Sequence, residues 1–231
     1  MAALPKTIAV LSLPRLGFSD FWGNALDVLG SLGIPLGRFT GAFWDQCLSR
    51  AMEQALETNA EYILTLDYDT LFARDDIIRL IQTAEENPHV DALAAMQVAR
   101  SVNRPLFTIL ADSGDANLTE IDEEALAKDL IRVDTAHFGC TLIRTDALRE
   151  LQKPWMTAHP GAAGDWGPDR TDPDIAFWRH WSEQGRSLYV APRVAVGHLE
   201  LMIRWPGPNL SILMQSPGEF KESGPPPERW T

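Results

Sequence analysis

Apolar runs and amphipathic stretches alternate along the first hundred residues of the chain. The apolar runs are short and contain β-branched residues, which is typical of strands buried on both faces. Between them, apolar residues recur at three- and four-residue intervals, as they do in helices that pack on one side. The pattern predicts strands at Thr7–Leu13, Tyr62–Leu66 and Val90–Val98, and helices at about Asp20–Leu32, Trp44–Leu56 and Asp75–Glu86.

The second half of the chain adds a long irregular segment, Lys153–Asp172, which contains glycines and two tryptophans. A loop of this length inside a compact domain is usually functional or disordered. The triple proline at Pro225–Pro227 marks a tail that we expect not to pack by itself. The other segments predict strands at Leu106–Leu110, Ile131–Asp134, Phe138–Arg144 and Ser187–Val196, and helices at Asp146–Leu151 and Pro173–Gln184.

This alternation predicts one α/β domain with a Rossmann-like sheet that is mixed but mostly parallel, covered by helices on both faces. In such sheets, ligands bind beyond the carboxyl ends of the strands. Polar side chains that directly follow a strand are therefore the candidates for chemistry.

Composition narrows the classes of protein. Of the 231 residues, 45% are hydrophobic and 23% charged, and the apolar runs are too short to span a membrane, so we expect a soluble protein. The two cysteines, Cys47 and Cys140, stand in apolar patterns, and no secretory signal begins the chain, which indicates a reducing cytoplasm. A net charge of −12 argues against broad electrostatic attraction to nucleic acids or acidic membranes, although it does not exclude a nucleic-acid substrate.

Two carboxylates, Asp67 and Asp69, follow the strand Tyr62–Leu66 two residues apart and can converge on one ligand. Mg²⁺ and Mn²⁺ commonly bind one or two carboxylates together with substrate phosphates. The alternative is that both residues only shape a turn and cap the next helix. His198 follows a late strand and can reach the same edge of the sheet, which favours the metal site.

Another acidic pair begins the helix Pro173–Gln184. Asp172 stands at the N-cap position and Asp174 in the first turn, so either can simply stabilise the helix. A carboxylate beside the metal can also accept the proton of a hydroxyl group. We favour Asp174 as this base, because capping already accounts for Asp172.

The order of the motifs YILTLDYDT, HFGCTLIRTDAL, DPDIAFWRHW and VAVGHLE resembles the GT-A glycosyltransferases of family 2, over Thr7 to about Glu200. The resemblance implies a hexosyltransferase that uses a nucleotide-diphosphate sugar such as a UDP-hexose, with Mn²⁺ or Mg²⁺ on Asp67, Asp69 and His198 and a base at Asp174 or Asp172. Many family members carry a second acid where this chain has Pro173, which leaves the choice of base open. It also implies a nucleotide-sugar half at about 1–100, an acceptor half at about 101–205 and a tail at 206–231.

The segments GAFWDQCLSRAMEQAL, MQVAR, KPW and GHLELMIRWP resemble phage glycosyltransferases, some of which modify hydroxymethylated bases in DNA. This narrower resemblance implies 5-hydroxymethylpyrimidine in DNA as acceptor and the cytoplasm of an infected bacterium as location. By comparison with GT-A relatives, the donor contacts are expected at Pro14, Arg15, Gln46, Arg50, Asp67, Tyr68, Asp69, Gln97 and Arg100. For Gln46, Arg50, Gln97 and Arg100, the alternative is a solvated surface position. The acceptor contacts are expected at Phe138, Gly139, Trp155 and Trp166, although both tryptophans can equally anchor the loop in the core.

Three other functions stay open. The acceptor can be a saccharide, a lipid-linked glycan or a protein. A haloacid-dehalogenase-like phosphatase would use LTLDYDT and the GDxxxD pattern from Gly164 to Asp169, but Thr70 stands one residue too early and no apolar strand precedes Asp165. An inactive nucleotide-sugar-binding module would keep the fold and lose turnover, and the intact acidic and histidine set argues against it.

Overall fold

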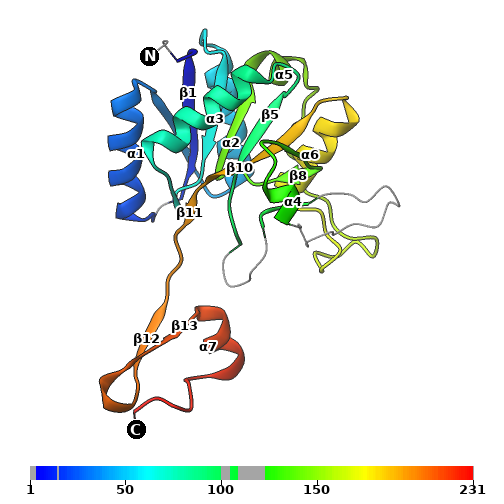
Figure 1. Ribbon diagram of the computed structural model, residues 1–231. Coiled ribbons are helices and arrows are strands. Elements are labelled where there is room, and N and C mark those ends of the chain that lie inside the picture. The colour runs from blue at the N-terminus through cyan, green and yellow to red at the C-terminus, as the bar shows by residue number, and fades with distance from the viewer. Residues whose placement is uncertain (1–3, 15, 100–104, 109–122, 231) are drawn as a thin grey trace.

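A seven-stranded mixed sheet forms the centre of the protein in this computed structural model, which describes residues 4–14, 16–99, 105–108 and 123–230 (Figure 1). The strand order is β2-β1-β3-β9-β5-β10-β7. The strands are β1 (Thr7–Leu13), β2 (Leu36–Thr40), β3 (Tyr62–Leu66), β5 (Ala92–Met96), β7 (Ile131–Arg132), β9 (Cys140–Arg144) and β10 (Leu188–Ala195).

The sheet is mostly parallel, as predicted. β1 pairs in parallel with both β2 and β3, and β5 pairs in parallel with β10. β9 lies between β3 and β5 and is antiparallel to both, and β7 is antiparallel to β10. Five strands therefore run in one direction, and the carboxyl ends of β1, β3, β5 and β10 meet at one edge.

Helices cover both faces of the sheet (Figure 1). The buried residues of α1 (Ser19–Leu32) and α3 (Arg74–Glu86) pack on one face with Ala9, Leu64 and Leu66 of the strands. On the opposite face, α2 (Trp44–Leu56), α5 (Thr145–Glu150) and α6 (Pro173–Glu183) pack on Val10 and Ile63. The period-two alternation of the strands thus sends neighbouring side chains into two separate cores.

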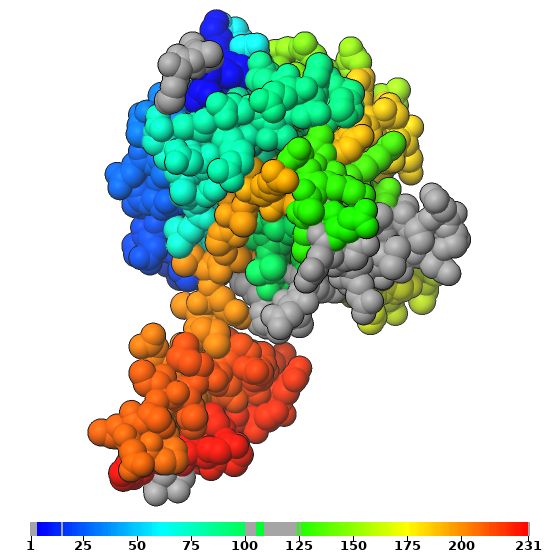
Figure 2. Space-filling view, viewed as in Figure 1, coloured from blue at the N-terminus to red at the C-terminus, as the bar shows by residue number. Residues whose placement is uncertain are grey.

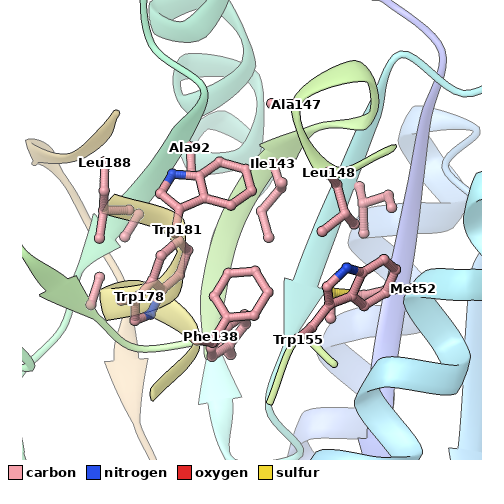
Figure 3. Close-up of a cluster of buried hydrophobic side chains, with 14 of the residues drawn as sticks. Met52, Ala92, Phe138, Ile143, Ala147, Leu148, Trp155, Trp178, Trp181 and Leu188 are labelled. Carbon is pink, nitrogen blue, oxygen red and sulfur yellow. The ribbon is translucent and has the colours of Figure 1, made fainter. Parts of the chain in front are cut away.

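The core under α6 is rich in aromatic rings (Figure 3). The ring of Phe138 stacks on Trp178 with centroids 4.9 Å apart and meets Phe177 edge-on at 5.1 Å. Trp178 meets Trp181 at 5.9 Å. Offset and edge-on ring pairs add to the stabilisation from burial alone, so α6 is held firmly against the start of β9.

Three two-stranded pairs lie outside the main sheet. β4 (Thr70–Leu71) pairs with β11 (Gly197–His198), and β6 (Phe107–Thr108) pairs with β8 (Thr135–Ala136). Only part of the predicted strand Leu106–Leu110 lies within the described residues. A further helix, α4, covers Glu123–Leu126.

The C-terminal segment forms a hairpin and a helix that stand apart from the sheet domain (Figure 1). The hairpin joins β12 (Ile203–Pro206) and β13 (Ile212–Gln215) through the 3₁₀ turn Pro208–Leu210, and α7 (Pro217–Ser223) follows. We expected a tail without packing of its own. Instead, Trp205 stacks on Phe220 with centroids 6.0 Å apart.

The two cysteines are placed as their apolar sequence patterns predicted. Cys47 and Cys140 are buried free thiols, which pack as small hydrophobic side chains. Within the described residues, no helix is both long enough and apolar enough to cross a membrane.

Candidate active site

A tight turn after β3 carries the two predicted acids. The Asp67 N–H donates to the Gly139 carbonyl at 3.2 Å, and the Thr70 N–H donates back to the Asp67 carbonyl at 3.1 Å. Thr70 then opens β4, where it lies opposite His198 in β11. The short β4–β11 ladder therefore brings a histidine from near the end of the sheet domain to the acidic turn, at the carboxyl edge where ligands are expected.

The side chains of Asp69 and His198 meet in this site. Nε2 of His198 lies 3.4 Å from Oδ2 of Asp69, and both side chains are largely buried. Nδ1 of His198 lies 3.0 Å from the Val98 carbonyl oxygen. A carbonyl only accepts hydrogen bonds, so Nδ1 carries a proton and Nε2 is the nitrogen that faces the carboxylate. The Leu199 N–H donates to the Asp69 carbonyl at 2.7 Å and fixes the relative position of the two segments.

This pair fits a divalent cation. Two ligand atoms that lie about 2.1 Å from one cation, roughly 90–110° apart, are roughly 3.0–3.4 Å from each other. A histidine that ligates a metal usually donates its other ring N–H to a carbonyl or carboxylate, as His198 does to Val98. Two protein ligands leave most of the coordination shell to phosphate oxygens and water, which suits Mn²⁺ or Mg²⁺.

The three predicted ligands do not form one preassembled set. Among the described residues, no group of three or more His, Cys, Asp or Glu side chains is arranged to hold a metal ion. Oδ1 of Asp67 instead accepts a hydrogen bond from the Trp44 indole at 3.3 Å. The structure therefore joins Asp69 and His198, and holds Asp67 beside them with its carboxylate bonded to Trp44.

Negative charge accumulates at this edge. The pKa of Asp67 is raised from 3.8 to about 6, mainly by burial and next by the Asp69 carboxylate. The hydrogen bond from Trp44 and the charge of His198 oppose this shift, whereas Asp174 adds to it. Asp174 is thus near enough for its charge to act on Asp67, although it comes from a helix on a distant part of the chain.

Asp172 and Asp174 have different surroundings at the start of α6. Both carboxylate oxygens of Asp172 accept hydrogen bonds from Arg170, at 2.8 and 3.2 Å, and the residue is exposed. We expected the Asp172 side chain to cap α6, but within the described residues it makes no capping hydrogen bond. Asp174 is half-buried, accepts a hydrogen bond from the Ile175 N–H at 2.9 Å, and has a pKa raised by burial and by Asp172. The Asp172 carboxylate is therefore engaged by Arg170, whereas burial keeps the Asp174 carboxylate more basic.

A network of buried polar groups lies next to the acidic turn, on the side of the protein core. Gln97, only 3% exposed, donates to the Thr70 hydroxyl and to the Gly197 carbonyl, both at 3.2 Å. It therefore links the ends of β5, β4 and β11. The donor contact at Gln97 stays a prediction; in the structure, its amide nitrogen binds Thr70 and Gly197 inside the protein.

Gly139 lies within the same network. A Cβ at this position would lie 2.8 to 2.9 Å from polar atoms of Gln97, His137 and Thr70. Such contacts are too short for real side chains, so only glycine fits. Gly139 therefore packs closely against buried side chains, and its carbonyl accepts the hydrogen bond from the Asp67 N–H. The acceptor contact at Gly139 stays a prediction.

His137 belongs to the same buried polar network. Its Nδ1 accepts a hydrogen bond from the Gly139 N–H at 3.0 Å, and its Nε2 lies 2.9 Å from the Ala95 carbonyl. Because one ring nitrogen accepts and the other donates, the neutral imidazole satisfies both partners. The pKa of His137 is lowered from 6.5 to about 4, mainly by burial and also by the charge of His198, while the hydrogen bond to the Ala95 carbonyl opposes the shift.

The predicted donor contacts are dispersed around the acidic turn. Tyr68 stacks on Phe18 with centroids 6.1 Å apart, and Pro14 is half-buried after β1. Gln46 is exposed on α2, and the Arg50 guanidinium lies 5.2 Å above the Phe39 ring. Arg15 and Arg100 lie outside the described residues.

Of the aromatic residues predicted to contact the acceptor, two lie in the core and one lies on the surface. Phe138 is buried and meets Trp44 edge-on, with centroids 5.6 Å apart. Trp155 is buried, donates to the Leu151 carbonyl at 3.1 Å and carries Lys153 above its ring. It is therefore the core anchor that we considered as an alternative. Trp166 is 60% exposed at the tip of the irregular loop and can stack on a ligand.

The irregular loop is closed at its base and tied internally. His159 and Thr171 exchange two backbone hydrogen bonds of 3.0 and 2.9 Å. Asp165 and Asp169, the acids of the GDxxxD pattern, accept hydrogen bonds from backbone N–H groups of the loop itself. The loop's own structure therefore accounts for both acids. Beneath the loop, a cavity of about 240 Å³ opens against α6, between Thr157, His159 and Arg179.

Sequence reasoning missed Trp44, His137 and Phe18. His137 directly precedes Phe138 and Gly139, which were predicted, so its position was a usable signal. Trp44 stands in the first turn of an amphipathic helix, where the hydrophobic pattern gives no indication of a hydrogen bond to Asp67. The partner of Phe18 depends on the turn at Tyr68, which local pattern does not reveal.

Solved structures share this architecture at low sequence identity. A197 from STIV aligns with a TM-score of 0.56 at 15% identity, over 91% of this chain and 94% of that one. GalNAc-T7, solved with UDP, GalNAc and Mn²⁺, aligns with a TM-score of 0.51 at 12% identity, over 84% of this chain. The alignment spans 44% of the GalNAc-T7 chain. No family model and no curated protein sequence matches the chain.

The fold is GT-A. At these identities the likeness shows the fold alone, and it agrees with the strand order, with antiparallel β9 between β3 and β5, and with helices on both faces of the sheet. The GT-A fold predicted from the motifs is confirmed. The chemistry of this chain must be argued from its own site.

Proposed function

We propose that the protein is a glycosyltransferase that moves a sugar from a nucleotide-diphosphate donor to a hydroxyl acceptor. The observation that carries this proposal is the pairing of Asp69 Oδ2 with His198 Nε2 at 3.4 Å, at the carboxyl edge of a GT-A sheet. A neighbour of the same fold was solved with UDP, GalNAc and Mn²⁺, which supports a donor of this class.

Asp69 and His198 would hold Mn²⁺ or Mg²⁺, with Asp67 beside them. The bound cation would supply positive charge to the leaving diphosphate. Trp44 and the network of Gln97 and His137 keep these side chains in place before substrate arrives. Such preorganisation matters because small displacements at a reacting centre reduce rates strongly.

Asp174 acts as the general base in this proposal. The acceptor oxygen forms a bond to the anomeric carbon, the bond from that carbon to the diphosphate breaks, and the hydroxyl proton passes to Asp174. Its half-buried carboxylate with a raised pKa suits proton acceptance better than that of Asp172, which Arg170 neutralises. The cavity beneath the irregular loop lies along α6, the helix that begins at this base, and is a suitable place for part of the acceptor.

For the donor and acceptor themselves, we propose a UDP-hexose and 5-hydroxymethylpyrimidine in DNA. The DNA proposal rests on the resemblance of GAFWDQCLSRAMEQAL, MQVAR, KPW and GHLELMIRWP to phage enzymes. An enzyme that acts on a base takes it out of the stack, so one exposed ring such as Trp166 would be useful. The net charge of −12 requires that phosphate contacts be few and local.

The test is incubation with Mn²⁺, mixed nucleotide sugars and DNA that contains 5-hydroxymethylcytosine, followed by mass spectrometry of the nucleosides. A hexose adduct supports the whole proposal. Hydrolysis of the donor without any adduct would remove the DNA acceptor and retain the glycosyltransferase. If the protein turns over p-nitrophenyl phosphate but no nucleotide sugar with any acceptor, then it is a phosphatase and not a glycosyltransferase. If it binds a nucleotide sugar without turnover, then it is an inactive binding module.

A further inference from the structure

The hairpin of β12 and β13 and the helix α7, together called the C-terminal arm, project away from the sheet domain (Figures 1 and 2). The hairpin exposes apolar side chains. Ile212 is 62% exposed and Met214 50%, both on β13. Leu210, at the turn, is also exposed. Contiguous exposed apolar residues are uncommon on monomeric proteins and usually mark an interaction surface.

The two faces of the hairpin differ. Ile203, Trp205, Leu213 and Gln215 lie on the face with lower exposure, where Trp205 stacks on Phe220. The Trp205 indole donates to the Gln215 side chain at 2.9 Å, and Gln215 donates to the Gly224 carbonyl at 2.8 Å. The opposite face, which carries Ile212 and Met214, is exposed. A two-stranded hairpin is marginally stable by itself, so this unit gains from a further strand.

The register shows which backbone groups of β13 are free to accept that strand. Pro206 lies opposite Ile212, and Arg204 opposite Met214. Pro206 has no N–H, so Pro206 and Ile212 form a non-hydrogen-bonded pair. Hydrogen-bonded and non-hydrogen-bonded pairs alternate along an antiparallel ladder, so Arg204 and Met214 form the next non-hydrogen-bonded pair. The N–H and C=O groups of Ile212 and Met214 therefore point away from β12, toward the outer edge of β13.

The two edges of the hairpin are not equivalent. On the outer edge of β12, Pro206 offers no donor and Arg204 adds a charge, which are two ways in which proteins prevent edge pairing. The outer edge of β13, with the sequence Ile-Leu-Met-Gln, has neither a proline nor a charge. Within the described residues, the β12–β13 sheet contains no third strand.

We propose that β13 pairs with β13 of a second copy of this chain, antiparallel and about a two-fold axis. The two hairpins would form one four-stranded sheet, with Ile212 and Met214 of both copies on the same face. β13 suits itself as partner because it has no charged side chain, so self-pairing brings no like charges together. The C-terminal arm projects from the sheet domain (Figure 2). Pairing through it would keep the two sheet domains apart and lower the repulsion between chains of net charge −12.

Two proline variants test this edge directly. Met214→Pro removes an outward-facing N–H from β13 and should leave the bonds within the hairpin intact. Arg204→Pro is the matched control, because Arg204 lies opposite Met214 and its N–H points to the edge of β12 that Pro206 already blocks. We expect the wild type and Arg204→Pro to have the mass of two chains by light scattering, and Met214→Pro to have the mass of one.

A second variant distinguishes loss of the dimer interface from misfolding of the hairpin caused by the proline. Ile212→Lys with Met214→Lys places four charges on the shared face of the dimer without altering the backbone, so it should also give one chain. In the wild type, the amide protons of Ile212 and Met214 should exchange slowly with solvent at high concentration and at least about tenfold faster on dilution. The inference is wrong if the wild type is monomeric at high concentration. It is equally wrong if the dimer survives in both Met214→Pro and the double lysine variant, which would place the interface elsewhere.

Discussion

The indole N–H of Trp44 donates to Oδ1 of Asp67 at 3.3 Å, and this bond connects the acidic turn to the aromatic core. The Trp44 ring meets Phe138 edge-on, and Phe138 stacks on Trp178 of α6. The first turn of α6 carries Asp174. A continuous series of rings thus sets the distance between the proposed metal site and the proposed base. This series explains why buried aromatic residues lie so close to a polar site.

Trp44→Phe tests this connection. The variant retains an aromatic ring against Phe138 but removes the donor to Asp67. A hydrogen bond to a charged group is worth about 1.5–3 kcal/mol, so if most of it acts in the transition state kcat should fall by about 10- to 100-fold. Measurement of kcat, KM and the Mn²⁺ concentration for half-maximal activity would check this.

A suitable control is Trp205→Phe, which removes an indole hydrogen bond in the C-terminal arm, far from the site. Its kcat should equal that of the wild type. If both variants lose activity equally, or if Trp44→Phe changes only the melting temperature, then Trp44 does not position Asp67.

The Asp69–His198 pair leads to a prediction about metal binding. Mn²⁺ together with UDP should raise the melting temperature of the wild type, since a ligand that binds only the folded state stabilises it. Asp69→Asn and His198→Ala should lose most of this increase and nearly all transfer activity, while their melting temperatures without ligand stay close to that of the wild type. EDTA should reverse the effect in the wild type.

His89→Ala serves as the comparison, because His89 is exposed and precedes β5, at the edge of the sheet opposite the acidic turn. Full activity of Asp69→Asn or His198→Ala in the presence of EDTA would show that this pair is not a metal site.

The two acids of α6 should respond differently to neutralisation. Asp174→Asn keeps the size of the side chain but cannot accept a proton, and loss of a general base reduces kcat by about 10²–10⁴-fold. Asp172→Asn weakens only an exposed ion pair with Arg170, so kcat should change less than about threefold. Steady-state kinetics at saturating donor would compare them. A larger loss in Asp172→Asn would reverse the assignment.

His137 makes the stability of the protein depend on pH. Its pKa is about 4 in the folded protein, below the ordinary value of 6.5 that applies to the unfolded chain, so the unfolded chain binds the proton more readily. The stabilising contribution of neutral His137 is complete above pH 6.5 and is lost as the pH falls toward 4. Asp67 acts in the opposite direction over the same range, because its raised pKa favours the folded state at low pH.

The comparison of wild type with His137→Gln isolates one of these effects. Between pH 7 and pH 4.5, the free energy of unfolding should fall by about 2.5 kcal/mol more in the wild type than in the variant. Asp67 is present in both proteins, so its contribution cancels, as does the pH-independent effect of the substitution. Urea unfolding at the two pH values gives the four free energies. Equal pH dependence in both proteins would mean that His137 is not held neutral.

The sheet could be predicted from sequence because its strands are buried on both faces. Tyr62–Leu66 is an uninterrupted apolar run, and its predicted bounds are those observed. β2 was missed because it is an edge strand with half-exposed residues and contains Gly37 and Arg38, so it has no hydrophobic run. The hairpin of β12 and β13 was missed because Pro206 and the exposed apolar positions resemble a tail.

The site was predictable where residues directly follow strands. Asp69 and His198 meet because the carboxyl ends of parallel strands share an edge, which follows from topology. The burial of Gln97 could not be predicted in this way, since a glutamine after a strand can face either ligand or core. The direction in which the Gln97 side chain points depends on its hydrogen bonds to Thr70 and Gly197, which come from other parts of the chain. Polar networks of this kind are properties of tertiary structure.

The last prediction concerns the irregular loop. The segment from about Thr157 to Arg170 should close over the donor and exclude water from the reaction. The pair of backbone hydrogen bonds between His159 and Thr171 holds its base, so closure should consist of movement of the tip, where Trp166 is exposed. Cleavage of the tip by protease should slow at least about fivefold with UDP-sugar and Mn²⁺, as expected when a flexible segment becomes ordered.

Asp69→Asn provides the decisive control for loop closure. This variant should bind Mn²⁺ and donor poorly, so the same ligands should leave its loop as sensitive to protease as before. Cleavage at the C-terminal arm should not respond to donor in either protein, which controls for inhibition of the protease itself. If the wild-type loop is cut equally fast with and without ligand, the loop is not a lid, and the internal hydrogen bonds of Asp165 and Asp169 then indicate a rigid structural element.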